Sequence, residues 1–451
     1  MSDVTTHQLP KKFHDAVEKW RQTYLPDFDY LIENWQRYFP RDEPFRLCTF
    51  RECGMPATIE VGEEKGKAKY QRACDMAPER AHLLAAAIKA QASTEFGSIQ
   101  QHQLTLARAQ DEEEQAMVLR MMAEELRHGY QMLSLLVEDD WQPITGQTAG
   151  EAIEEILSMR TGSHLLGAFN IDFESFVDNI VFCALIDRVG KYQLSMQRVS
   201  AYSPMAESMP QMLREEAFHL AAGVVPLRRW VVKAAAGSPM ITMDVIQRHL
   251  NKWVPRGLEM FGDERGGATN VRWGFKPMKN LEAQQQYHQE CGKVVRDLNM
   301  RFLRARLPKL SLGEAEALLA RLESERGSEQ GIAFDDLLKL PHHDFFRRRG
   351  EPAFRKVGLA GEPFATAEEY LEHLARALPD GYRATRDFRD FVEAIGAIER
   401  GEKTPEEAQK QMPQLRRVGG VCPCSRAVRW VADENVELPE PPAGGGTVHG
   451  G

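Results

Sequence analysis

The stretches Glu124-Glu125-Leu126-Arg127-His128 and Glu215-Glu216-Ala217-Phe218-His219 decide the fold of this chain of 451 residues. Each contains the pattern Glu-x-x-His, and residues three apart on a helix lie on one face, so both side chains can bind the same metal ion. The pattern also occurs at Glu79 to His82, where a helix begins and no second carboxylate mirrors it. We therefore assign a structural role to that third copy.

Each of the other two copies has a partner carboxylate on the preceding helix. The partner lies about as far before the turn between the two helices as the Glu of the copy lies after it. Glu95 precedes Glu125 by 30 residues, and Asp187 precedes Glu216 by 29 residues. In both cases the midpoint falls on a predicted turn, at residue 110 and at residues 201–202. With about 1.5 Å of rise per residue, each carboxylate lies roughly 20 Å from its turn, which is deep enough to be inside a bundle. Each of two antiparallel helix hairpins thus carries two carboxylates at one depth.

Long helices are expected between Pro78 and Ala236, where the chain is rich in Ala, Leu, Met, Glu and Gln. Asp111 can cap the second helix while Glu114 closes a capping box. Pro210 suits the first turn of the fourth helix. The expected helices are Glu79–Ala109, one from near Asp111 to about Asp139, a short one over Glu151–Arg160, one over Phe173–Ser200, and one that follows a turn containing Ser203, Pro204 and Pro210 and ends near Gly237.

Two hairpins joined by one long connection are typical of ferritin-like four-helix bundles. We therefore predict an all-α chain that contains such a bundle, with one long crossover and additional helices at both ends. The expected organisation is an N-terminal extension of helices and loops (1–77), the bundle (78–237), accessory helices that pack on it (238–307), a mostly helical C-terminal region (308–437) and a disordered tail (438–451).

The predicted metal ligands are four carboxylates and two histidines: Glu95, Glu125, His128, Asp187, Glu216 and His219. Carboxylate oxygens and imidazoles suit iron or manganese, and the set is that of di-iron and di-manganese bundle proteins. The third helix offers Asp187 where glutamate is usual. Glu174 and Asp178 are alternatives, but they lie too far from the turn to mirror Glu216. The shorter aspartate predicts that this helix is pulled inward or that one metal ion is more open.

Composition narrows the class of protein further. The net charge of −9 argues against binding to nucleic acid. The N-terminus lacks a secretory signal, and the longest apolar run, Ile180–Ile186, is about a third of the length that spans a bilayer. We expect a cytoplasmic protein without a membrane span. The seven cysteines form no disulfide framework, and Cys422 and Cys424 are interpreted as unrelated thiols instead of a metal or redox pair.

The chain resembles the oxygenase components of benzoyl-CoA 2,3-epoxidases and, more distantly, those of phenylacetyl-CoA epoxidases. The resemblance covers about residues 78–235, and an aspartate in the third helix is what that family has. It assigns iron ligation to the same six residues that the spacing selects. The matching stretches are Thr94-Glu95, Gln100-Gln101, Glu124 to His128, Asp187-Arg188-Val189-Gly190-Lys191-Tyr192-Gln193-Leu194, and Glu215 to Leu220.

The resemblance implies an enzyme that activates O2 at two iron ions and epoxidises the aromatic ring of an acyl-CoA thioester. Electrons would come from a separate NADPH-dependent reductase with flavin and iron–sulfur centres. This chain has neither a dinucleotide fingerprint nor a four-cysteine cluster motif, so we expect no flavin or nicotinamide bound to it. Arg188 and Lys191 are expected to be surface cations, or else to support the carboxylates or contact CoA phosphates.

Three other classes of protein remain open from the sequence. The first is a di-iron oxygenase for another substrate, such as an amine or a carrier-bound acyl group. The second is a protein that stores or oxidises iron, against which the roughly 290 residues outside the bundle count. The third is a scaffold subunit without metal, against which the presence of all six ligands counts. Either a monomer or a homodimer is compatible with the sequence.

Overall fold

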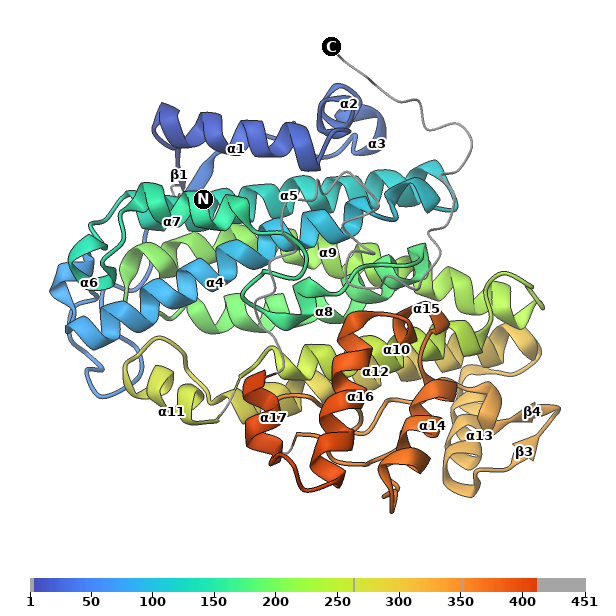
Figure 1. Ribbon diagram of the computed structural model, residues 1–451. Coiled ribbons are helices and arrows are strands. Elements are labelled where there is room, and N and C mark those ends of the chain that lie inside the picture. The colour runs from blue at the N-terminus through green and yellow to red at the C-terminus, as the bar shows by residue number, and fades with distance from the viewer. Residues whose placement is uncertain (1–3, 263, 351–352, 412–451) are drawn as a thin grey trace, which may run out of the picture.

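Four long helices form the centre of the computed structural model, which describes residues 4–262, 264–350 and 353–411 (Figure 1). One antiparallel hairpin consists of α4 (Pro78–Gln103) and α5 (Glu112–Val137), and the other of α8 (Phe176–Gln197) and α9 (Ser203–Ala235). The connection between the hairpins contains two shorter helices, α6 (Gln142–Thr145) and α7 (Ala149–Ser158). The predicted all-α, ferritin-like bundle with one long crossover is therefore confirmed.

Local sequence signals start these helices where they were expected. The Asp111 carboxylate accepts a hydrogen bond of 2.8 Å from the backbone N–H of Glu114 at the start of α5. The Ser175 hydroxyl accepts one of 3.1 Å from the N–H of Asp178 at the start of α8. Such caps satisfy N–H groups that have no partner within the helix. The Glu114 carboxylate does not close the predicted box, because it is buried and pairs with Arg229 at 3.3 Å.

The predicted turn before the fourth helix is shorter than expected. α9 begins at Ser203 with Pro204 in its first turn, so Pro210 lies inside the helix and the prediction for Pro210 was wrong. A proline in a helix interior removes one hydrogen bond. Met209, Pro210 and Met212 are all buried, and the packing of this face offsets that loss.

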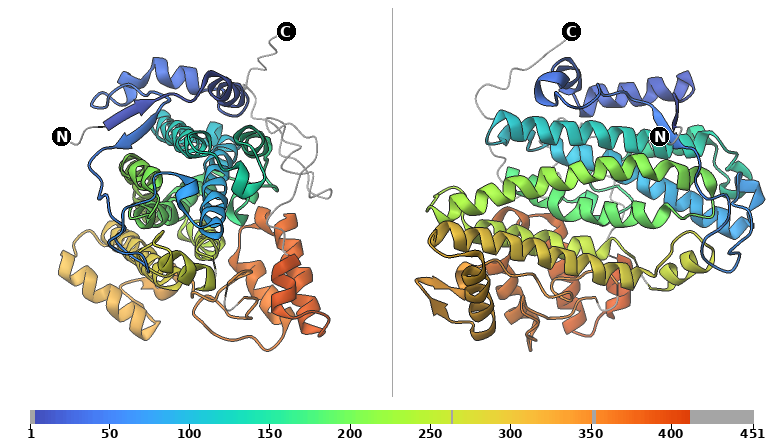
Figure 2. Two further views of the ribbon diagram at one scale, coloured as in Figure 1. Left: turned by 90° about the vertical axis from the view of Figure 1, so that its left-hand side faces the viewer. Right: turned by 180° about the vertical axis from the view of Figure 1, so that it is seen from behind.

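A second layer of helices packs on one side of the bundle, as the end-on view shows (Figure 2, left). α10 (Met243–Glu259) lies against α8, and α12 (Asn280–Arg306) lies against α9. α11 (Glu264–Arg272) stands between them in the chain. Beyond this layer lie the C-terminal elements: α13 (Leu312–Glu325), β3 (Ser328–Glu329), β4 (Ile332–Ala333), α14 (Ala367–Ala377), α15 (Asp380–Arg383), α16 (Arg386–Glu399) and α17 (Pro405–Gln411).

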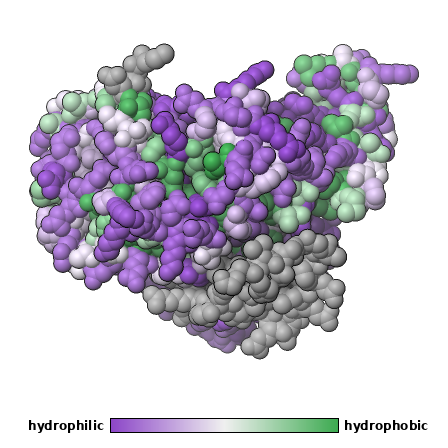
Figure 3. Space-filling model, turned by 90° about the horizontal axis from the view of Figure 1, so that it is seen from above, coloured by the Kyte–Doolittle hydropathy of each residue, from purple (hydrophilic) through white to green (hydrophobic). Residues whose placement is uncertain are grey.

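The N-terminal residues cover the opposite side of the bundle (Figures 1 and 2). The hydroxyl of Tyr130 on α5 accepts a hydrogen bond of 2.7 Å from the backbone N–H of Leu9, which fastens this layer to the bundle. Seen from above, the face that carries it is mainly hydrophilic, with small hydrophobic patches (Figure 3). Its elements are β1 (Val4–His7), α1 (Lys11–Tyr24), α2 (Phe28–Glu33), α3 (Trp35–Tyr38) and β2 (Thr49–Glu52), with β1 antiparallel to β2.

Two further observations concern the chain as a whole. Among the described residues, no helix combines the length and the apolar character needed to cross a membrane. The five cysteines in the described ranges, Cys48, Cys53, Cys74, Cys183 and Cys291, are free thiols. The predicted tail (438–451) and the pair Cys422 and Cys424 lie outside the described residues.

Candidate metal centre

All six predicted ligand side chains meet in the middle of the four-helix bundle. Five of them are buried, and the sixth, Glu95, has a side chain that is 13% exposed. They come from all four helices: Glu95 from α4, Glu125 and His128 from α5, Asp187 from α8, and Glu216 and His219 from α9.

The two histidines direct their Nδ1 atoms toward carboxylates. His128 Nδ1 lies 3.7 Å from a carboxylate oxygen of Glu125 and 3.9 Å from one of Glu95. His219 Nδ1 lies 3.5 Å from Glu125 and 3.1 Å from Glu216. The centroids of the two imidazole rings are 5.3 Å apart. Glu125 therefore lies between the two histidines and is central to the cluster.

Crowding of the carboxylates shifts their proton affinities. Burial, followed by repulsion from Glu125, raises the pKa of Glu95 well above its ordinary value. Burial and repulsion from Glu216 and Glu125 do the same to the pKa of Asp187. Burial also raises the pKa of Glu216. Without a cation among them, these groups resist being charged together, which is the condition that a bound metal ion relieves.

Each histidine is held by a glutamate of the other hairpin. His128 Nε2 on α5 donates a hydrogen bond of 3.0 Å to Glu215 on α9. His219 Nε2 on α9 donates one of 3.2 Å to Glu124 on α5. A proton on Nε2 leaves Nδ1 free as a metal ligand, and such carboxylate–histidine pairs orient the imidazoles of metal sites. The two contacts cross the bundle in opposite directions.

Arginines in turn fix these two glutamates. Arg127 lies 2.6 Å from Glu215, and Arg120 lies 3.0 Å from Glu124. No role was predicted from the sequence for Glu124 or Glu215. A signal was present, because a glutamate stands directly before the Glu of both Glu-x-x-His copies.

The donor atoms fit a metal ion. Glu125 Oε2, Asp187 Oδ2 and His219 Nδ1 are buried and have no hydrogen-bond partner. Buried polar atoms are nearly always paired, so three such atoms in one cluster fit the ligand set of a cation. Ligand atoms of Glu125, His128 and His219 lie within 4.8 Å of one another. Carboxylates with imidazoles and no thiolate suit iron or manganese better than structural zinc.

The alternative carboxylates lie elsewhere. Asp178 is fully buried and accepts hydrogen bonds of 2.9 Å from both Lys252 and Trp253 on α10, so it joins α8 to the second layer. Glu174 precedes α8 and is likewise not a member of the cluster. Glu79 and His82 are exposed at the start of α4, as expected for a structural copy of the pattern.

Arg188 and Lys191 both contact α12. Arg188 lies 2.9 Å from Glu290, and Lys191 lies 3.3 Å from the same carboxylate. The expectation of surface cations was wrong for Arg188, which is only 8% exposed, because α12 covers that side of α8. The side chain of Lys191 is 41% exposed, so the expectation of a surface cation agrees with the structure for Lys191.

A cavity of about 290 Å³ adjoins the cluster. It extends between α4 and α8, from the carboxylates toward the start of α4 and the end of α8. Five of the six candidate ligands, the four carboxylates and His128, form part of its wall, together with apolar side chains that include Leu166, Phe169 and Ile186. A mostly apolar wall beside a few polar groups is typical of a small-molecule site.

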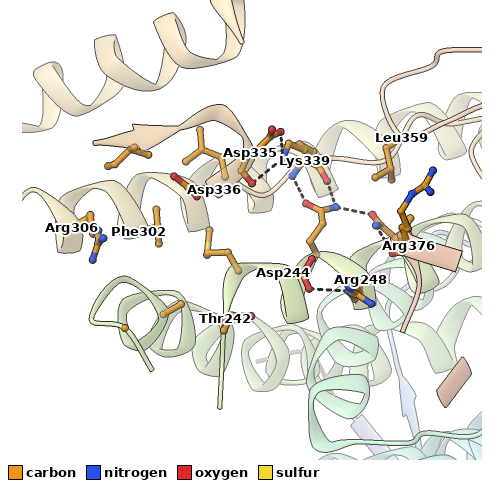
Figure 4. Close-up of a pocket in the computed structure, with 18 of the residues that line it drawn as sticks. Thr242, Asp244, Arg248, Phe302, Arg306, Asp335, Asp336, Lys339, Leu359 and Arg376 are labelled. Carbon is orange, nitrogen blue, oxygen red and sulfur yellow. Dashed lines mark hydrogen bonds and ion pairs between the residues drawn. The ribbon is translucent and has the colours of Figure 1, made fainter. Parts of the chain in front are cut away.

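A larger cavity of about 570 Å³ lies at the other end of α10, against the C-terminal region (Figure 4). Four of its charged side chains form two ion pairs. Arg248 lies 2.9 Å from Asp244, and Lys339 lies 3.3 Å from Asp335. Because the carboxylate–histidine cluster lines the smaller cavity, we place the candidate site there.

The bundle and its buried cluster define a ferritin-like protein with a candidate carboxylate–histidine metal centre. Residues 70–310 match the family described as phenylacetic acid catabolic protein. A curated relative, benzoyl-CoA oxygenase component B of Aromatoleum evansii, is 26% identical in an alignment of 352 residues that covers 70% of this chain and 71% of the relative. The chain therefore belongs to the phenylacetic acid catabolic protein family. The resemblance found in the sequence is confirmed, and the matching region is longer than residues 78–235.

Proposed function

We propose that this protein is the oxygenase component of a multicomponent enzyme that epoxidises the aromatic ring of a benzoyl-CoA-like thioester. The observation that carries the proposal is the pair of Glu-x-x-His copies whose histidines are held across the bundle by Glu215 and Glu124. The family of the chain and the name of its relative support the substrate class. Two iron ions would be held by Glu95, Glu125, His128, Asp187, Glu216 and His219, with manganese as the other metal that suits these ligands.

When bound, iron supplies the activation of O2, so that one oxygen atom enters the ring and the other leaves as water with two electrons and two protons. The residues of the chain supply the rest. Apolar side chains such as Leu166, Phe169 and Ile186 offer a surface for the ring and keep water from the cluster. Glu95 lines the cavity and its side chain is 13% exposed, so this ligand would lie beside the substrate.

The electrons would come from a separate NADPH-dependent reductase that carries flavin and iron–sulfur centres. The relative is named as component B of an oxygenase, which supports a system of several proteins. Within that system this chain would bind the metal, O2 and the acyl-CoA substrate.

The first test is the iron content of the purified protein. After expression with ample iron, we expect about two iron ions per chain in the parent and none in Glu125→Ala or His219→Ala. The matched control is His82→Ala, which changes the exposed third copy of the pattern and should keep both ions. A folded parent without metal would refute the oxygenase proposal and favour a scaffold subunit.

A parent that contains iron would then be supplied with O2, a reductase and different substrates. Epoxidation of aromatic acyl-CoA thioesters would support the proposal. Turnover of amines or carrier-bound acyl groups alone would keep the metal centre and replace the substrate class.

A further inference from the structure

The cavity beside the cluster has two chemically different ends. The inner end contains the carboxylates, including Asp187 of α8. The outer end contains amides and one ammonium group, from Gln193, Gln197, Asn270 and Lys276. Gln193 follows Asp187 by six positions on the same helix, which corresponds to about 9 Å along its axis. A ligand that fills the cavity therefore meets acids at one end and hydrogen-bond donors at the other.

Among the described residues that line this cavity, Lys276 is the one lysine or arginine. Its Nζ donates a hydrogen bond of 2.6 Å to Gln193 Oε1. In the described part of the chain, no carboxylate forms an ion pair with it. An ammonium group has three N–H donors, so two remain for a ligand.

Burial makes the charged ammonium group of Lys276 energetically unfavourable unless it has a further partner. Its side chain is half-buried, and burial lowers the pKa of Lys276 to about 8. The fully buried Lys252 differs, because it lies 2.9 Å from Asp178. Charged groups removed from water need hydrogen bonds or a counter-charge. An electron-rich oxygen of a bound ligand would supply a partner that the described residues do not.

We propose that Lys276 donates a hydrogen bond to the carbonyl oxygen of the substrate's acyl group and so determines which part of the substrate faces the cluster. This inference rests on the proposed function. Gln193, which accepts from Lys276, and Asp187 are only about 9 Å apart along α8, so a small aromatic acyl group that accepts a hydrogen bond from Lys276 extends toward the carboxylates. Lys276 is thus a positioning residue for the ring.

The test compares two CoA derivatives that differ at the carbonyl. Benzoyl-CoA is a thioester, whereas S-benzyl-CoA has a CH2 group in place of the carbonyl group. Equilibrium binding of each would be measured by calorimetry to the iron-loaded parent, to Lys276→Met and to Lys279→Met. The last variant is the matched control, because Lys279 is an exposed lysine of the same segment and does not line the cavity.

We expect the parent and Lys279→Met to bind the thioester more tightly than the thioether by roughly 10- to 100-fold, the effect of a hydrogen bond to a charged group. In Lys276→Met this preference should disappear, while the affinity for the thioether stays within about twofold. Iron content and melting temperature identify any variant that is misfolded, and Lys276→Gln then provides a polar, uncharged second variant.

Two outcomes would overturn the proposal in distinguishable ways. If Lys276→Met lowers the affinity for both CoA derivatives equally, or for neither, then Lys276 does not bind the carbonyl group. The proposed function would still stand. If the iron-loaded parent binds neither CoA derivative, the substrate class itself is wrong.

Discussion

The two hairpins of the bundle carry matching candidate ligands but are packed differently. In the α4/α5 hairpin, Gly129 makes room for a side chain, since a Cβ atom there would lie 2.9 Å from the Phe96 ring. In the α8/α9 hairpin, Gly223 makes room for a backbone, since a Cβ atom there would collide with the amide nitrogen of Ala184. The backbones of α8 and α9 therefore lie closer together than any residue other than glycine at position 223 would allow.

This difference explains how a shorter acid reaches the same cluster. The close pair is the one that supplies Asp187, whereas the other hairpin supplies Glu95 at the corresponding position. Gly190, one turn after Asp187, also lies against a ligand, because a Cβ atom there would collide with the Glu216 carboxylate. The inward position of the helix compensates for the missing methylene. Backbone packing and ligand length therefore depend on each other in the second hairpin more than in the first.

The largest expected effect is a loss of stability when alanine replaces glycine in one hairpin but not in the other. Gly223→Ala should lower the free energy of unfolding by about 2 kcal/mol or more, because backbone atoms cannot move aside, even after the gain of about 1 kcal/mol in helix propensity. Gly129→Ala should stay within about 1 kcal/mol of the parent, because the Phe96 ring can rotate away. Urea unfolding of the metal-free proteins measures both. Equal losses in the two variants would show that the hairpins are packed alike.

A second prediction concerns the glutamates that hold the histidines. Glu124→Gln and Glu215→Gln should each reduce iron affinity by about 10- to 100-fold, as measured by competition with a chelator. Glu215→Gln should also lower stability by about 1–3 kcal/mol more, since it leaves Arg127 without its carboxylate, whereas Arg120 keeps Asp42. If the two variants are equally stable, the asymmetry between the hairpins does not extend to these contacts.

The smallest predicted effect is on the pH dependence of stability. His102 lies seven residues after Glu95 on α4, and the corresponding position of α8 is Leu194. Burial lowers the pKa of His102 to about 4, although its Nδ1 lies 2.6 Å from the Asn179 amide oxygen. The unfolded chain binds a proton near pH 6.5 and the folded chain does not, so stability falls as the pH decreases from 6.5 to 4.

The variant His102→Gln keeps a donor for Asn179 but cannot be protonated. Between pH 6 and pH 5, the parent should lose about 1 kcal/mol more unfolding free energy than this variant. Urea unfolding at the two pH values provides the measurement, and other titrating groups cancel in the comparison. Equal losses of unfolding free energy in the parent and the variant would mean that His102 is already neutral in the unfolded chain or charged in the folded one.

The sequence predicted the hairpins and the six clustered residues because both follow from short-range rules. A Glu-x-x-His pattern places two side chains on one helix face, and equal spacing about a turn places two carboxylates at one depth. The roles of Glu124 and Glu215 depend on how one hairpin lies against the other, which no local pattern specifies. The same holds for Asp178, whose partner Lys252 lies in the second layer. The position of Lys276 in the cavity was not predicted, because it depends on the path of the chain after α11.

The crossing contacts also set an order of events during biosynthesis. His128 and Glu215 are 87 positions apart in the chain. At about 5–20 residues per second, the ribosome needs about 4 to 17 s to make the segment between them. Until then the newly made first hairpin carries Glu95, Glu125 and His128 without the glutamate that orients the imidazole. Insertion of the proposed metal would therefore follow translation of the second hairpin, which ends at Ala235 of 451 residues.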